Sequence, residues 1–204
     1  MIKQNSFFNI IKENVVKVSK QRKNIFFKKK VITLTGASGL IGVNLIAFFY
    51  LLSKTIYSPK KIYIVYKSYL PEYFNFLKKD KKFTFIKKDL AKSTTNIMLS
   101  DIVIHGAGYA QPQKFIENSM QTLLLNSLTT YELLKKTKKN GSFIFLSSSE
   151  IYSGLIGNIV EERIGLTNTL HPRACYIEGK RFGETLINTF KNKHNINAKA
   201  VRVC

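Results

Sequence analysis

Two residues in the last third of the chain, Tyr176 and Lys180, have the types and the spacing of an acid/base pair. Residues four apart lie on the same face of a helix, so the phenol and the ammonium can act together. A tyrosine hydroxyl ordinarily has a pKa near ~10, and a neighbouring ammonium would lower that pKa by stabilising the phenolate. Such a pair can remove the proton of a hydroxyl group while hydride leaves the same carbon.

A glycine-rich turn lies much earlier in the chain. In the sequence TGASGLIG, the three glycines recur at intervals of three, between an apolar run and a helical segment. Glycine lets the backbone approach a pyrophosphate closely, and the following helix offers free N–H groups to that anion. The position of the turn directly after a strand therefore predicts a dinucleotide site. The residues expected to contact the cofactor here are Gly36, Ser38, Gly39, Leu40, Ile41 and Gly42.

The elements that must position these residues alternate between strands and helices. Apolar runs predict six strands, at residues 31–35, 61–66, 83–86, 101–105, 142–146 and 198–203. Helical spacing of apolar residues predicts helices at residues 40–52, 117–138 and 172–191. Such alternation predicts a doubly wound parallel sheet of the Rossmann type, with helices on both faces. Ligands bind at the carboxyl ends of such strands, which is where SSSEIY (residues 147–152) lies.

The end of the second predicted strand departs from the usual dinucleotide pattern. An acidic residue that binds the adenosine ribose is expected there, but the strand ends in Tyr66 followed by Lys67. Lys67 could meet the 2′-phosphate of NADP, or it could be a solvated lysine. The choice between NAD and NADP stays open on the residues alone.

Residues 1–30 form a basic segment before this alternation and are assigned as a unit separate from residues 31–204. The apolar residues of the segment recur at the spacing of one helix face, at Phe7, Phe8, Ile11, Val15 and Val18. We therefore expect a helical extension that packs against the rest of the chain. Binding to a membrane is the less favoured interpretation.

The chain has 204 residues and a formal net charge of +21. Its lysines occur as scattered doublets and Asn, Ile and Phe are frequent, which favours a compositional bias over a nucleic-acid or membrane partner. With no run of 18 apolar residues and no signal-peptide pattern, a cytoplasmic location is expected. The two cysteines, Cys175 and Cys204, predict no disulfide, and no Cys/His spacing indicates a metal site.

Five motifs in order resemble the extended short-chain dehydrogenases. They are TGASGLIG, HGAG at residues 105–108, LNS around Asn126, SSSEIY and PRACYIEGKR, and the resemblance covers the chain from about residue 31 to the end. The last is most similar to the corresponding segment of UDP-glucuronate decarboxylases. The resemblance implies an NAD-dependent enzyme that acts on a nucleotide sugar, and it favours NAD over NADP because that family uses NAD.

The resemblance also implies roles for single residues. Ser148 would hydrogen-bond the reacting hydroxyl, Tyr176 would be the acid/base, and Lys180 would hold the nicotinamide ribose. Glu150 matches an active-site glutamate of decarboxylases and dehydratases. Cofactor contacts are implied for Asp89, Leu90, Gly106 and Ala107. The alternatives are that the serine is a turn residue and that Glu150 is a surface acid.

Other residues are interpreted as structural or carry no visible role. His105 and Asn126 are expected to support the backbone, Cys175 to pack on another helix face, and His171 and His194 to have no function. The helices that begin near Glu117 and Pro172 match those of the family's dimer interface, which implies a homodimer.

Three activities and one inactive form remain as interpretations. The favoured activity is decarboxylation of UDP-glucuronate, and the alternatives are a 4-epimerase, a 4,6-dehydratase and a non-catalytic cofactor-binding fragment. Dehydratases carry an Asp-Glu pair where this chain has Ser149 and Glu150, which argues against dehydration. The chain stops at AVRVC, where relatives continue into a substrate-binding lobe. We therefore expect a C-terminal truncation and negligible sugar turnover.

Overall fold

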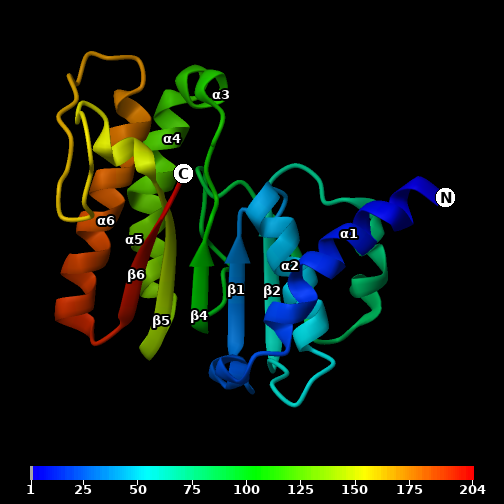
Figure 1. The fold of residues 1–204 in the computed structure, drawn as a ribbon. Helices are drawn as coiled ribbons and strands as arrows, with labels where there is room; N and C mark the ends of the chain where they lie inside the picture. Colours follow the sequence, from blue (N-terminus) through cyan, green and yellow to red (C-terminus); the bar gives the residue numbers. More distant parts are fainter. Residues whose placement is uncertain (1) are drawn as a thin grey trace.

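The computed structural model describes residues 2–204 and contains one parallel sheet (Figure 1). Its strands follow the order β3-β2-β1-β4-β5-β6. Their bounds are β1 Val31–Thr35, β2 Lys61–Tyr66, β3 Phe83–Lys87, β4 Ser100–His105, β5 Thr137–Ser148 and β6 Asn197–Val203. The strand order reverses between β1 and β4, which is the switch point where such sheets bind ligands. The predicted doubly wound parallel sheet is confirmed.

Helices cover both faces of the sheet (Figure 1). The α-helices are α1 Ile2–Ser19, α2 Leu40–Leu52, α3 Pro112–Glu117, α4 Ser119–Asn126, α5 Leu128–Lys135 and α6 Ala174–His194. Three 3-10 helices are η1 Arg22–Phe27, η2 Glu72–Lys79 and η3 Ser149–Tyr152. Within residues 2–204, no helix has the length and apolar character that crossing a membrane requires.

Two hydrophobic clusters hold the layers together. On one face, Ile46 and Phe49 of α2 pack against strand residues such as Leu34. On the other, Leu133 of α5 and Ile187 of α6 belong to a separate buried cluster. The sheet therefore stands between two cores, and the carboxyl ends of its strands remain available to a ligand.

Helix α1 packs against the first core through part of the predicted face. Ile11 is 4% exposed, and Phe8 and Val15 contact the same cluster. Val18, which was predicted to share this face, is 44% exposed. The side chain of Phe7 lies outside the described part of the structure.

The helix predicted for residues 117–138 is divided into α4 and α5, and its last two residues, 137–138, belong instead to strand β5. At Ser127 the backbone leaves the helical region, with φ −108° and ψ −87°. The Ser127 hydroxyl donates to the Leu123 carbonyl at 2.6 Å, and the Ser127 N–H uses the same carbonyl at 2.9 Å. Side chains that compete for backbone groups interrupt a helix, and the spacing of apolar residues does not register this competition.

Candidate functional site

A cavity of about 610 Å³ lies at the carboxyl ends of the strands. This volume falls within the range of small-molecule and cofactor sites. Every residue that the sequence predicts for the site lines it: Gly36, Ser38, Gly39, Leu40, Ile41, Gly42, Lys67, Asp89, Leu90, Gly106, Ala107, Ser148, Glu150, Tyr176 and Lys180. The structure thus brings together two motifs that are more than 100 residues apart. The role of each residue remains a prediction.

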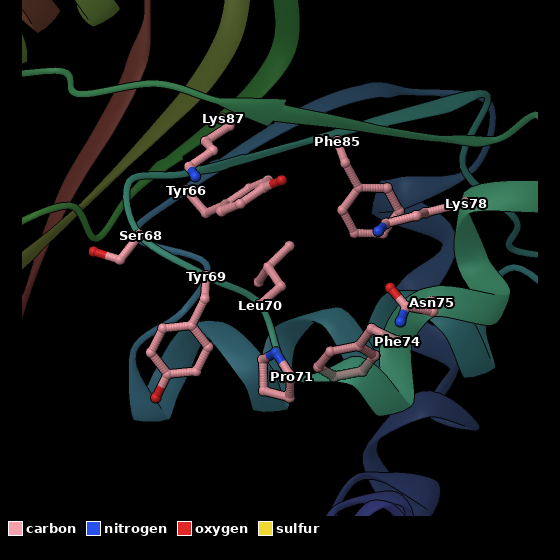
Figure 2. A pocket seen from close by; sticks show the side chains of 10 residues that line it. All are labelled: Tyr66, Ser68, Tyr69, Leu70, Pro71, Phe74, Asn75, Lys78, Phe85 and Lys87. Carbon is pink, nitrogen blue, oxygen red and sulfur yellow. The ribbon is translucent and has the colours of Figure 1, made fainter.

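A second cavity of about 130 Å³ lies beside the ends of β2 and β3 (Figure 2). Aromatic and aliphatic side chains, among them Phe74, Phe85 and Leu70, form much of its wall, with Lys78 and Lys87 also lining it. Tyr66 lines both cavities. The volume of the second cavity is below that of ordinary ligand pockets, so the larger cavity is the candidate site.

The glycine turn is shaped by close approach of backbone atoms. Gly36 has φ +69°, and a Cβ atom there would lie 2.1 Å from the Gly106 carbonyl oxygen. At Gly42 a Cβ atom would lie 2.4 Å from the Gly36 carbonyl oxygen. At Gly39 the nearest atom would be an ordinary 3.4 Å away. Gly36 and Gly42 are therefore required by the fold, whereas Gly39 leaves space beside the N-terminus of α2.

A buried histidine connects the first and fourth strands behind this turn. His105 Nε2 lies 3.0 Å from the Leu125 carbonyl, so Nε2 must carry the proton and donate it. Nδ1 then accepts from the Thr35 hydroxyl at 2.9 Å, and that hydroxyl accepts from the Ala107 N–H at 3.3 Å. Burial lowers the pKa of His105 to about 4, so the ring is neutral. His105 thus positions the loop at Gly106.

The far end of the cavity carries a charge pair. Lys67 Nζ lies 3.1 Å from an Asp89 carboxylate oxygen and 2.8 Å from the Tyr109 hydroxyl. The hydrogen bond with Tyr109 raises the pKa of Lys67, with burial opposing it and Asp89 reinforcing it. The end of β2 therefore lacks the expected acid, but Asp89 after β3 places a carboxylate nearby, and this carboxylate is already paired with Lys67.

The opposite end of the cavity holds the predicted acid/base pair. Tyr176 is 8% exposed, and its ring stacks on the Phe115 ring with centroids 4.5 Å apart. Lys180 Nζ donates to the Leu146 carbonyl at 2.7 Å and lies 5.6 Å from the centroid of the Tyr176 ring. Burial lowers the pKa of Lys180 to about 7, although Glu184 opposes this shift.

The prediction that Lys180 lowers the pKa of Tyr176 is wrong for this structure. Burial raises the pKa of the phenol, and the charge of Glu150 raises it further. Ser148 and Arg173 act in the opposite direction, and Lys180 is directed to the backbone of β5. The i, i+4 spacing places both side chains on one helix face but does not determine which acceptor the ammonium chooses.

Arg173, which precedes α6, was not predicted as a site residue. Its guanidinium forms an ion pair with Glu150, with Nε 3.2 Å from one carboxylate oxygen. The same guanidinium lies 5.6 Å from the centroid of the Phe115 ring. The Glu150 N–H donates to the Ser148 hydroxyl at 3.2 Å, so the serine caps η3. Glu150 is therefore a half-buried, paired carboxylate and not a free surface acid.

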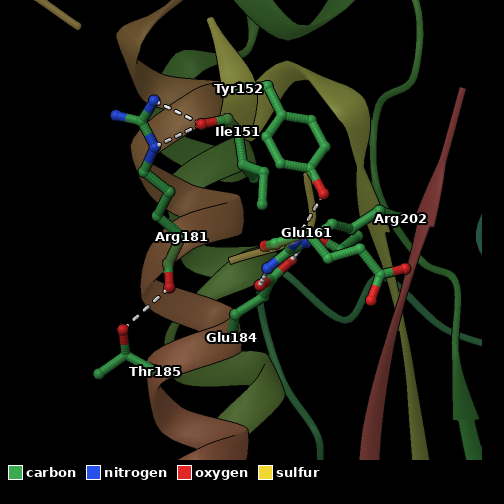
Figure 3. Close-up of polar contacts among 8 residues, drawn as sticks. Ile151, Tyr152, Glu161, Arg181, Glu184, Thr185 and Arg202 are labelled. Atoms are coloured by element: carbon green, nitrogen blue, oxygen red, sulfur yellow. Dashed lines mark hydrogen bonds and ion pairs between the residues drawn. The ribbon is translucent and has the colours of Figure 1, made fainter. Parts of the chain in front are cut away.

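A second ion-pair network supports the segment that carries Ser148 (Figure 3). Arg202 of β6 donates to both carboxylate oxygens of Glu184, at 3.1 and 2.7 Å, and to the Tyr152 hydroxyl at 2.6 Å. Ser147 donates to the same carboxylate at 2.5 Å. The sequence offered a signal for this network, because Glu184 lies four residues after Lys180 and Arg202 interrupts an apolar strand.

Two glycines of α6 allow this helix to approach its neighbours. A Cβ atom at Gly183 would lie 2.6 Å from the Phe145 ring, and one at Gly179 would lie 3.3 Å from Asn126. The close contact that small residues permit is thus with α4 and β5 of the same chain. The Asn126 amide donates to the Thr122 carbonyl at 2.9 Å, as its expected backbone role requires.

The amino-acid sequence is similar to those of known proteins. Residues 32–204 match the model of the NAD dependent epimerase/dehydratase family. UDP-glucuronic acid decarboxylase 6 of Arabidopsis thaliana is 30% identical over 188 residues, which is 89% of this chain and 52% of that protein. UDP-glucuronic acid decarboxylase 1 of Xenopus tropicalis is 32% identical over 105 residues, 50% of this chain and 25% of that protein.

Solved structures with the same fold include two epimerases. UDP-glucuronic acid 4-epimerase from Bacillus cereus, in complex with UDP-glucuronic acid and NAD, has a TM-score of 0.61 and 22% identity, covering 84% of this chain and 55% of that one. UDP-N-acetylglucosamine 4-epimerase from Methanobrevibacter ruminantium has a TM-score of 0.65 and 22% identity, covering 86% and 55%. The chain spans about half the length of the first curated relative, 52%.

Proposed function

The chain belongs to the NAD dependent epimerase/dehydratase family, and we propose that its large cavity binds NAD to oxidise a nucleotide sugar transiently at C4. One observation carries the proposal. The glycine turn, Ser148, Tyr176 and Lys180 line the same cavity although the sequence separates them widely. A site that only binds a dinucleotide would not need an acid/base pair at the end of the cavity opposite Lys67 and Asp89.

The residues of the cavity fit a dinucleotide. Open space beside Gly39 at the start of α2 suits a pyrophosphate, which would receive hydrogen bonds from free N–H groups of the helix N-terminus. At the adenosine end, Asp89 provides a carboxylate for ribose hydroxyls. The same carboxylate would repel a 2′-phosphate, so NAD is favoured over NADP despite Lys67.

At the reacting end, each side chain has a defined task in the proposal. When bound, NAD supplies the acceptor for the C4 hydride. Tyr176, in its phenolate form, takes the C4 hydroxyl proton, and Ser148 hydrogen-bonds the same oxygen. Ser148 also lowers the pKa of Tyr176, which partly offsets the effect of burial. Lys180 binds the nicotinamide ribose once its ammonium turns from the Leu146 carbonyl.

Decarboxylation of UDP-glucuronate, a lyase reaction, is the activity that we propose for the whole protein. A C4 ketone makes the C6 carboxylate a β-keto acid, and loss of carbon dioxide places the electron pair on the C4 oxygen, where Tyr176 and Ser148 donate. Dehydration would need a second acid beside Glu150, and that position holds Ser149. The curated relatives named above are decarboxylases, which supports this choice.

A 4-epimerase is the second candidate, because epimerases share this fold. Epimerisation needs the same proton transfer at C4. The pairing of Glu150 with Arg173 does not separate the two candidates, because the charge of the arginine is already neutralised and an epimerase with this fold also binds UDP-glucuronic acid. A cofactor-binding protein without activity is the remaining alternative.

We also propose a homodimer formed through α4, α5 and α6. Apolar side chains on these helices are exposed, among them Met120 (63%), Leu128 (56%) and Phe182 (52%). Burial of such side chains between two copies would stabilise the dimer.

The two free cysteines fit a cytoplasmic location, where thiols stay reduced.

Calorimetry tests the cofactor proposal with the 204-residue chain. We expect NAD to bind, NADP to bind more weakly, and Gly39→Glu to abolish both, because a carboxylate would occupy the pyrophosphate position. Equal binding by the variant and the parent would contradict the site.

For the activity, the full-length protein is incubated with NAD and UDP-glucuronate, and carbon dioxide with UDP-xylose is expected. Epimerisation without carbon dioxide would select the second candidate.

A further inference from the structure

Lysine doublets that are scattered in the sequence meet at one edge of the sheet. All paired strands are parallel, so each begins at the edge opposite the cavity (Figure 1). We call this edge, with the segments that lead into it, the amino edge. Its lysines are Lys28, Lys29 and Lys30 before β1, Lys60 and Lys61 at β2, Lys81 and Lys82 before β3, and Lys138 and Lys139 near the start of β5.

Hydrogen bonds show that lysines from separate doublets are neighbours. The Lys30 carbonyl accepts from the N–H groups of Lys60 at 2.8 Å and Lys61 at 3.4 Å. The Lys61 ammonium in turn donates to the Lys81 carbonyl at 2.7 Å. Three segments that are about 30 and 20 residues apart in the chain therefore form one continuous basic surface.

Acidic residues offset little of this charge. Residues 14–71 contain no aspartate or glutamate. Of the two acids near the edge, Asp101 is paired with Lys138 at 3.1 Å and Asp80 with Lys54 at 3.6 Å. The surface keeps a large positive excess, which attracts anionic partners of any kind at moderate salt.

Exposed apolar side chains lie among these lysines. Ile25 and Phe26 of η1 are 61% and 44% exposed, and Ile56, between α2 and β2, is 75% exposed. The N–H of Lys29 donates to the Ser58 carbonyl at 3.0 Å, which joins the two segments. In Figure 1 both segments lie at the lower ends of β1 and β2. The next residue of η1, Phe27, instead packs against aromatic rings of α2.

We propose that the amino edge docks the protein on an anionic lipid surface. Lysines near such a surface are attracted to its headgroups, and apolar side chains gain by entering the boundary with the acyl chains. A nucleic acid would use the lysines, but it offers no partner for two exposed isoleucines. In this orientation the NAD-binding cavity, at the other ends of the strands, faces the aqueous phase. The proposal does not depend on the activity.

Vesicle flotation of the 204-residue chain tests the proposal. We expect binding to vesicles of phosphatidylcholine mixed with phosphatidylglycerol, little binding to phosphatidylcholine alone, and weakening with salt. The triple variant Lys28→Gln, Lys29→Gln and Lys30→Gln should bind the anionic vesicles roughly 100-fold less tightly, because each lysine contributes about fivefold. Ile56→Ser should weaken binding about tenfold without changing the charge.

Matched variants at the other end of the molecule serve as controls. Lys87→Gln, Lys92→Gln and Lys114→Gln remove the same charge away from the amino edge, and Leu166→Ser removes a side chain that is 89% exposed. Both should bind vesicles like the parent. Equal losses in the two triple variants would overturn the proposal in favour of a net-charge effect. Tight binding to an RNA oligonucleotide, with no vesicle binding or no effect of Ile56→Ser, would overturn it in favour of a nucleic-acid partner.

Discussion

The two ends of the large cavity are built in different ways. At the glycine turn, backbone atoms of neighbouring segments approach so closely that Gly36 and Gly42 admit no side chain. At the reacting end, side chains from β5, α6 and β6 meet, and ion pairs of Glu150 and Glu184 hold them. The first end is encoded mainly within eight consecutive residues, with the loop at Gly106 packed against them, whereas the second depends on side-chain contacts across the fold. Substitutions should therefore act locally at one end and cooperatively at the other.

The largest effect is expected at the glycine turn. Gly36→Ala would force a Cβ atom to within 2.1 Å of the Gly106 carbonyl oxygen, at a φ of +69°. We expect the free energy of unfolding to fall by more than about 3 kcal/mol, together with loss of NAD binding. Chemical denaturation measures the first and calorimetry the second.

Gly39→Ala is the matched control in the same turn. Its Cβ atom would have 3.4 Å to the nearest atom, so stability should change by less than about 1 kcal/mol while NAD binding weakens. If Gly36→Ala were as stable as Gly39→Ala, the contrast between a turn required by the fold and one required by the ligand would be lost.

This difference also explains what the sequence could predict. Strand β1 and helix α2, which flank the turn, have the predicted bounds, 31–35 and 40–52, because period and glycine position are local signals. All predicted site residues line one cavity, because they follow parallel strands and parallel strands end at one edge of the sheet. Arg173 was missed, because an ion pair depends on distances between elements that no local pattern contains. Glu184 and Arg202 were missed although their positions in the sequence offered a signal. The gathering of lysines at the amino edge was missed likewise.

His105 gives the next largest effect, through pH. Its pKa is lowered from 6.5 to about 4, so the unfolded chain binds more protons between these pH values. The stabilisation is fully present above pH 6.5 and is lost as the pH falls towards 4, with a magnitude on the order of 3 kcal/mol. Unfolding of the parent and His105→Gln is compared at each pH, and the parent should lose more stability on acidification. His194→Gln, at an exposed histidine, should behave like the parent.

At the reacting end, we expect the pair of Arg202 and Glu184 to be coupled. Glu184→Gln leaves Arg202 without its charged partner and weakens the acceptor of Ser147. Because the pair is partly exposed, a loss of about 2 kcal/mol is expected, with NAD binding retained. A double-mutant cycle with Arg202→Met should show positive coupling. The more exposed pair of Lys135 and Glu132, whose side chains are 48% and 27% exposed, should give less than about 0.5 kcal/mol, and equal coupling in both pairs would remove the supporting role of the network.

The smallest effect is expected at Lys67, where the preference of the cavity for NAD or NADP can be measured. Its ammonium already lies 3.1 Å from Asp89, so Lys67→Gln frees that carboxylate for the ribose hydroxyls of NAD. NAD affinity should change by less than about fivefold, and the weak affinity for NADP should fall further because the remaining charge is negative. Lys88→Gln is the control, since Lys88 lines the same cavity and donates to Thr95 at 3.1 Å. Calorimetry with both cofactors decides the matter: a parent that prefers NADP and a Lys67→Gln variant that prefers NAD would show that the lysine, and not Asp89, selects the cofactor.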